Sequence, residues 1–161
     1  MAVDMFIDLE GIKGESQDDK HKDQIEVLSW SWGMSQAGSM HTGSGGGAGK
    51  VSVQDLTFTK WVDKASTSLY QSCTIGTHVK KATLTVRKAG EKPLEYLVID
   101  LDDVIITNVH TGGSQGEERL TENVTLNFRK FGIKYTEQTA EGGGGTSPQW
   151  KYDIAASKQW S

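Results

Sequence analysis

Apolar and polar residues alternate at period two along much of the chain, which predicts a protein built mainly from β-strands. The most asymmetric stretch is Ile25 to Gln36. One face of this stretch carries Leu28, Trp30, Trp32 and Met34, and the other carries Val27, Ser29, Ser31 and Gly33. We expect a single strand that buries its bulky face in the core. Its small polar face is then free to meet water, a partner or a wide cavity.

Similar alternation predicts further strands over residues 2–10, 51–62, 81–87, 94–101, 104–110, 119–130 and 150–157. The phase of the pattern reverses between Arg129 and Phe131, which predicts a bulge or a sharp bend. The strand over residues 94–101 is apolar on both faces. We therefore expect a second cover beside its own core, which is either the helix or another subunit.

One segment has the spacing of an α-helix, with apolar positions at Val62, Ala65, Leu69 and Cys73. Asp63 or Ser66 can cap its start, and Gly76 can supply the left-handed residue that ends it. These elements predict a mainly β fold, a compact antiparallel β-barrel or sandwich of about eight or nine strands with one flanking helix. The length of 161 residues fits a single domain spanning residues 1–161.

Two glycine-rich segments interrupt this pattern. Residues 37–50 are expected to form an extended loop, and residues 141–161 a flexible joint followed by a C-terminal strand and tail. The first segment does not fit a phosphate-binding loop, because Ser44 stands where that motif needs glycine and Val51 where it needs a hydroxyl. It also leads into a strand and not a helix, so no helix N-terminus meets a phosphate.

The net charge of -4 and pI near 5.5, without a cluster of Lys and Arg, argue against a nucleic-acid partner. The single Cys73 cannot form an intramolecular disulfide, which suits a reducing compartment. The first residues lack the features of a cleaved signal peptide, and no stretch approaches the roughly twenty apolar residues of a membrane span. These features predict a cytosolic protein with no membrane span.

Catalytic chemistry finds little support in the sequence. The 4 histidines lie far apart and Cys73 has no second thiol nearby, so we expect neither a metal site nor a cofactor. Asp100 and Asp102 share a face and leave open a carboxylate-based hydrolase, although a solvated strand end explains them as well. Trp150 and Trp160 leave open a monomeric β-sandwich module that binds a ligand, as lectins do. No nucleophile, base and orienting group come together, so we expect no enzyme.

Several segments in the same order resemble the Hcp (haemolysin-coregulated protein) family, the tube protein of bacterial type VI secretion. They are MAVDMFIDLEGIKGES, IEVLSWSWGMSQ, FTKWVDKAS, ATLTVRKAG, LEYLVIDLDDVIITNV and ERLTENVTLNFRKFGIKYTEQ. The resemblance implies a β-barrel with one helix on its flank and no catalysis. It also implies a homohexameric ring, rings stacked into a tube, a spike protein at the tip, a contractile sheath and small effectors in the lumen.

The resemblance assigns roles to residues of this chain. The lumen and its cargo would meet Ser29, Ser31 and Gly33, and the doubly apolar strand would form the ring interface through Leu97, Ile99 and Leu101. The glycine-rich loop would contact an adjacent subunit or ring through Met40, His41, Thr42 and Lys50. The protein would be cytoplasmic before firing and then secreted to the extracellular space or a target cell without a cleaved signal peptide.

Overall fold

The computed structural model describes residues 2–41, 43 and 46–160. Within these residues the chain forms eleven strands and one helix. Their bounds are β1 (Val3–Leu9), β2 (Ile25–Glu26), β3 (Ser29–Ser31), β4 (Met34–Gly38), β5 (Ala48–Val53), β6 (Leu56–Trp61), α1 (Ala65–Ile75), β7 (His78–Lys88), β8 (Leu94–Gly112), β9 (Thr121–Tyr135), β10 (Gln149–Asp153) and β11 (Lys158–Gln159). The predicted mainly β fold with one helix is confirmed, with more strands than expected.

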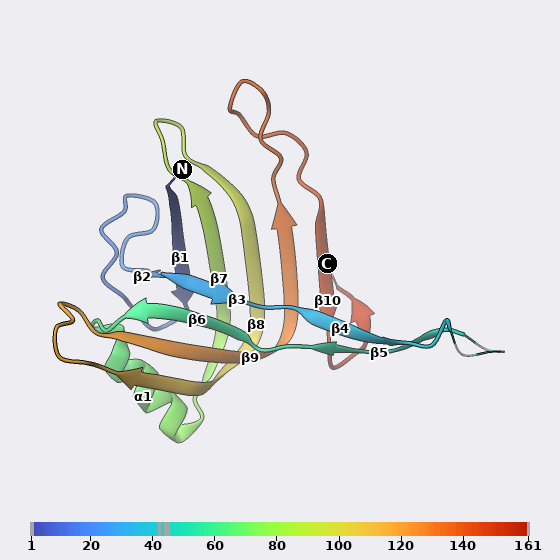
Figure 1. The fold of residues 1–161 in the computed structure, drawn as a ribbon, viewed down its shortest axis with the longest axis horizontal. Helices are drawn as coiled ribbons and strands as arrows, with labels where there is room; N and C mark the ends of the chain where they lie inside the picture. Colours follow the sequence, from blue (N-terminus) through green and yellow to red (C-terminus); the bar gives the residue numbers. More distant parts are fainter. Residues whose placement is uncertain (1, 42, 44–45, 161) are drawn as a thin grey trace.

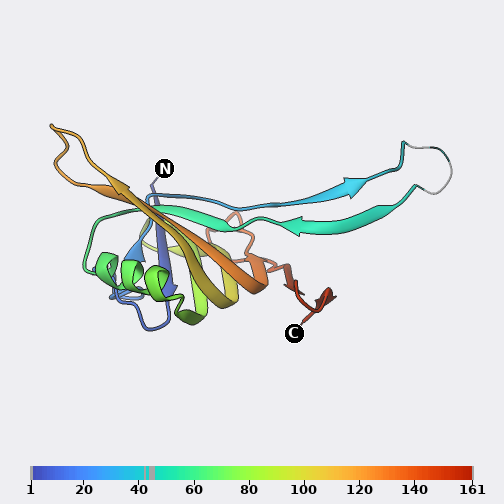
Figure 2. The same cartoon turned by 90° about the horizontal axis from the view of Figure 1, so that it is seen from below.

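Nine strands form one antiparallel sheet, from which the separate two-stranded ribbon β4–β5 projects (Figures 1 and 2). The main order is β11-β10-β9-β8-β7-β1-β2, while β6 pairs with β9 and β3 pairs with β6. Strand pairing among the described residues does not close into a barrel. Residues 27 and 28 join strand β1 to strand β6. The Val27 N–H donates to the Met5 carbonyl of β1 at 2.9 Å, and the Leu28 N–H donates to the Thr59 carbonyl of β6 at 2.8 Å.

The stretch expected to form one strand is divided among β2, β3 and β4. These pair with β1, β6 and β5 respectively, so the period-two phase restarts at each change of partner. Val27 is therefore buried although the pattern placed it on the small face, and Leu28 and Met34 are exposed although the pattern placed them in the core. Trp30 and Trp32 are only half-buried, but they pack against the core.

Strands β8 and β9 bend together where the phase reversal predicted a bulge or a bend (Figure 1). The buried positions of β9 change there from Phe128 to Phe131, and those of β8 from Leu101 to Val104. The pairing between the strands has no register shift at this point, and Asp103 takes a φ of 53°. The reversal is therefore a bend shared by two strands and not a bulge in one.

Helix α1 packs against the sheet and contacts β8 (Figure 2). Ala65 and Leu69 belong to the core, and Cys73 is half-buried against it. Gly76 ends the helix with a left-handed φ of 68°, as the sequence predicted, and its N–H donates to the Ser72 carbonyl. No helix in the described part of the chain is long and apolar enough to cross a membrane.

A buried ion pair fixes the start of the helix to the sheet. The ammonium of Lys60 on β6 lies 2.5 Å from a carboxylate oxygen of Glu122 on β9, and both side chains are 0% exposed. Lys60 also contacts Asp63 at 2.8 Å, and the Ser66 hydroxyl donates to Glu122 at 2.6 Å. The second Glu122 oxygen, Oε2, is buried without a hydrogen-bond partner. Helix position therefore depends on a polar network inside an apolar core.

Candidate functional surface

Strands β3, β6, β9 and β8 present a continuous surface of small polar side chains. Strand pairing aligns them in two rows, which are Ser29, Thr59, Asn123 and His110, and Ser31, Thr57, Thr125 and Asn108. All of them are exposed or half-buried, and none is Asp, Glu, Lys or Arg. We call this surface the polar face.

Side chains of the polar face hydrogen bond to one another across the strands. The Thr57 and Thr125 hydroxyls lie 3.2 Å apart, and the Thr59 hydroxyl donates to the Asn123 side-chain carbonyl at 2.6 Å. Such pairs hold short side chains against the sheet, which leaves few groups that reach outward. The two rows thus contain no Asp, Glu, Lys or Arg, and they offer mainly hydroxyls and amides.

The structure brings together two of the three residues that the sequence assigned to this surface. Ser29 and Ser31 lie next to each other in the two rows, whereas Gly33 follows the end of β3 and lies outside them. Sequence reasoning did not combine these serines with the threonines of β6. The signal that could have found them is the alternation that places Thr57 and Thr59 on one side of their strand.

Two of the three residues expected at the ring interface, Ile99 and Leu101, lie in the core of the single chain. Ile99 is 0% and Leu101 is 1% exposed in the single chain, and Leu97 is half-buried. The side chains of Ile99 and Leu101 therefore offer no surface to a neighbouring subunit. The expectation was wrong for these two because neighbouring strands, the core and helix α1 already surround β8.

The described part of the glycine-rich segment contributes to the β4–β5 ribbon, which extends away from the body (Figure 2). Met40 is 80% exposed, and His41 and Lys50 are also exposed. Thr42, which was assigned to the same contact, lies outside the described residues. The ribbon joins no other strand of the described chain, so its outer backbone groups are free of ladder pairing.

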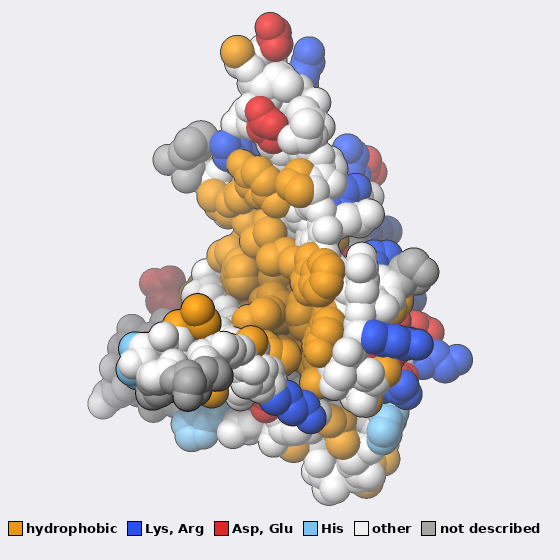
Figure 3. All heavy atoms as spheres, turned by 90° about the vertical axis from the view of Figure 1, so that its right-hand side faces the viewer, with side chains coloured by type: hydrophobic (Ala, Val, Ile, Leu, Met, Phe, Trp, Pro, Cys, Tyr) orange, Lys and Arg blue, Asp and Glu red, His pale blue; other side chains and the backbone are white. Residues whose placement is uncertain are grey.

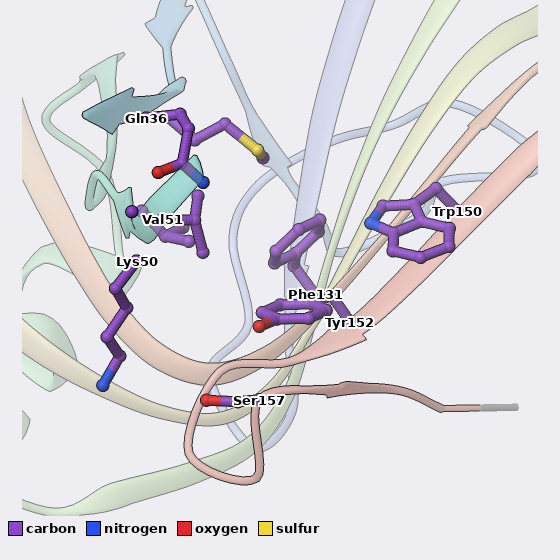
Figure 4. Close-up of a pocket in the computed structure, with 10 residues that line it drawn as sticks. Gln36, Lys50, Val51, Phe131, Trp150, Tyr152 and Ser157 are labelled. Atoms are coloured by element: carbon purple, nitrogen blue, oxygen red, sulfur yellow. The ribbon is translucent and has the colours of Figure 1, made fainter. Parts of the chain in front are cut away.

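An apolar groove lies between the base of this ribbon and β10 (Figures 3 and 4). It has a volume of about 470 Å³ and is lined mainly by Met34, Val51, Val53, Phe131, Trp150 and Tyr152. The Trp150 ring stacks on Tyr152 with centroids 6.3 Å apart, and 46% of Trp150 is exposed. We call this surface the apolar groove.

Trp160, the other tryptophan of the lectin-like alternative, is half-buried. Its indole N–H donates to the Phe131 carbonyl at 3.1 Å, and the ammonium groups of Lys130 and Lys151 each lie 5.1 Å from its ring. These contacts hold the ring at the end of the sheet. Trp150 and Trp160 therefore do not form one open aromatic platform.

The carboxylates of the hydrolase alternative lie on a half-exposed part of β8. Asp100 accepts a hydrogen bond from the Thr83 hydroxyl at 2.9 Å, and Asp102 pairs across the sheet with Lys81 and Lys130. No group of three or more His, Cys, Asp or Glu side chains within the described residues is arranged to hold a metal ion.

A separate ion cluster attaches the polar loop of residues 11–24 to the sheet. The buried Arg87 guanidinium on β7 contacts Asp18 at 2.6 Å and Asp4 at 3.3 Å. The hydrogen bond from Arg87 lowers the pKa of Asp18 to about 2. Next to it, the His21 ring stacks on Phe6 with centroids 4.6 Å apart. The cluster gives this loop a fixed place on the sheet.

A protein-family model described as "Type VI secretion system effector, Hcp" matches residues 6–135. The chain belongs to the Hcp family. It is 56% identical over 143 residues to protein hcp1 of Pseudomonas aeruginosa, and the aligned part covers 88% of each chain.

Solved structures agree with this assignment. Hcp1 from Salmonella typhimurium is 42% identical with a TM-score of 0.82, covering 99% of this chain and all of that one. A type VI secretion system effector from Yersinia pestis is 38% identical with a TM-score of 0.76, covering 94% of this chain and all of that one.

Membership of the Hcp family settles the general function. The chain is a type VI secretion tube and effector protein, and the family is structural and not enzymatic. Family membership also implies hexameric tube assembly. The hydrolase and lectin-like alternatives are therefore not adopted for this Hcp protein.

Proposed function

We propose that six copies of this Hcp protein close into a ring whose lumen is lined by the polar face. Stacked rings then form the tube, with a spike protein at the tip and a contractile sheath around it. The observation that carries this proposal is the pair of aligned rows of polar side chains that begin at Ser29 and Ser31 and contain no Asp, Glu, Lys or Arg. A channel that must let cargo pass benefits from a wall without charges or long side chains, because weak contacts release as readily as they form.

The β4–β5 ribbon supplies the contact with an adjacent ring in this proposal. Met40, His41 and Lys50 are exposed on a ribbon that no other described strand covers. Two-stranded ribbons are marginal alone in water, so an adjacent protein surface stabilises this one. Small effector proteins bind the polar face inside the ring. The assembled tube is cytoplasmic before firing and is then secreted to the extracellular space or a target cell.

Replacing Ser31 by arginine tests the lumen assignment. Ser31 is exposed on β3, at one end of its row in the polar face, so a long cationic side chain there fits the folded chain but enters the channel. Light scattering on a sizing column should give the same ring mass as the wild type, about six times 17.6 kDa. The small proteins that co-purify from the producing bacterium, counted by mass spectrometry, should be lost.

The matched control is Thr67→Arg, which places the same side chain at an exposed position of helix α1, away from the polar face. It should keep both the ring and the co-purifying proteins. An unchanged set of co-purifying proteins with Ser31→Arg would contradict the lumen assignment. A monomeric wild type would contradict the ring itself.

A further inference from the structure

His110 is the one side chain in the two rows of the polar face that changes charge near neutral pH. It lies on β8, in the row that also contains Ser29, Thr59 and Asn123, and strand pairing places it opposite Asn123. Its side chain is exposed, and it has no hydrogen bond or ion pair with the described residues. The imidazole can therefore gain or lose a proton without breaking a contact.

The side chains around His110 are uncharged. On the same side of the sheet lie Asn108 and Gly112 of β8 and Thr121, Asn123 and Thr125 of β9. Helix α1 packs against β8, and its sequence, ASTSLYQSCTI, contains no charged residue. Neither the sheet nor the helix places a charge next to the imidazole.

Charged groups of the neighbouring strands are engaged elsewhere. Lys60 of β6 and Glu122 of β9 pair with each other in the core, where both side chains are 0% exposed. The charged residues of the turn that follows β8 are Glu117, Glu118 and Arg119. No described carboxylate or cation contacts the His110 ring, so the pH of the solution decides its charge, and histidine titrates between about pH 5 and pH 8.

Assembly repeats this side chain around the channel. The inference rests on the ring and the lumen assignment proposed above, in which six copies place six imidazoles around one level of the wall. Rings of charged side chains determine what a channel admits and holds. Because the rows contain no Asp, Glu, Lys or Arg, protonation of His110 changes their charge in one direction, toward positive.

We propose that His110 makes the retention of cargo by the channel depend on pH, and that the cargo it retains is a protein with an acidic surface. Neutral imidazoles leave a wall that contacts cargo weakly, and the net charge of -4 on each chain opposes an acidic protein. Protonated imidazoles add a ring of positive charge that attracts carboxylates. Acidic cargo is then held at low pH and released as the pH rises.

A dye-labelled peptide rich in Asp and Glu is the probe, and the purified ring is the receptor. Fluorescence anisotropy should show binding at least about fivefold tighter at about pH 5 than at about pH 8. High salt should reduce this ratio, because screening weakens contacts between exposed charges. Light scattering at both pH values checks that the particle remains a ring of about six chains of 17.6 kDa.

Variants at His110 separate its charge from the other effects of pH. His110→Asn should bind the peptide weakly at both pH values, and His110→Lys should bind it tightly at both. The matched control combines Asn108→His with His110→Asn, which keeps the composition and places the imidazole at an exposed position on the same side of β8. This exchange should keep the pH dependence. Thr67→His combined with His110→Asn places the imidazole on helix α1 and should not restore it.

The outcomes distinguish the role of His110 from the assembly on which it rests. A wild-type ring that binds the peptide equally at both pH values would overturn the role of His110 while the ring stands. A His110→Asn ring that keeps the difference, or restoration by Thr67→His, would do the same. A monomeric wild type would overturn the ring and the pH-dependent retention together. Ser31→Glu adds a carboxylate to the polar face and should weaken peptide binding at both pH values. Unchanged binding in that variant would overturn the lumen assignment, and this inference with it.

Discussion

Replacing Lys60 by methionine tests how the buried ion pair sets stability. The Lys60 ammonium faces two carboxylates, Glu122 at 2.5 Å and Asp63 at 2.8 Å, and its side chain is 0% exposed. Its removal leaves the Glu122 carboxylate buried with only the Ser66 hydroxyl as a donor, since Glu122 Oε2 already lacks a partner. Breaking a buried pair on one side costs about 3–5 kcal/mol of unfolding free energy, and we expect the upper part of that range.

The reciprocal variant should cost less. In Glu122→Leu the Lys60 ammonium keeps Asp63 as its counter-charge and Ser66 as an acceptor at 3.2 Å. We expect a loss of about 3 kcal/mol, at the lower end of the same range. The double variant Lys60→Met with Glu122→Leu replaces both charges by apolar groups of similar size. It should lie within about 1 kcal/mol of the wild type, because neither charge remains buried.

Urea unfolding followed by tryptophan fluorescence measures these differences, since the chain has 5 tryptophans. Protein concentration must be equal in every sample and the native mass checked, because assembly raises apparent stability. The four proteins form a double-mutant cycle, and the expected coupling is several kcal/mol. A double variant whose loss equals the sum of the two single losses would refute the reasoning, as would a larger loss for Glu122→Leu than for Lys60→Met.

Two further predictions concern the polar loop and its ion cluster. The lowered pKa of Asp18 stabilises the folded state above pH 4, and this contribution is lost as the pH falls toward 2. The urea midpoint of Asp18→Asn should therefore lie below that of the wild type at pH 6 and converge with it near pH 2. A difference in midpoint that stays the same at both pH values would refute the role of the Arg87 contact. Gly14→Ala should lower the free energy of unfolding by about 1–3 kcal/mol, because an added Cβ would lie 2.5 Å from the Gln24 backbone carbonyl oxygen. Gly38→Ala is the control, since an added Cβ there has nothing within 4 Å, and its loss in thermal or urea unfolding should be less than half as large.

Local chemistry in the sequence decided the elements whose signals lie within one segment. The apolar spacing of Ala65 and Leu69 and the left-handed Gly76 predicted the helix and its end, because those signals need no partner elsewhere in the chain. The bend near Asp103 and Phe131 was also predicted, since a reversal of period-two phase has few backbone solutions. The family resemblance likewise depended on segments read in order.

Tertiary structure decided which strand pairs with which, and that choice assigned the faces. A change of partner resets the alternation, so Leu28 and Met34 became exposed while Val27 entered the core. Ile99 and Leu101 look available for a contact in the sequence, yet the neighbouring strands and the helix enclose them. The polar face and the apolar groove each combine segments far apart in the chain, and period-two reading of one strand carries no information about its neighbours.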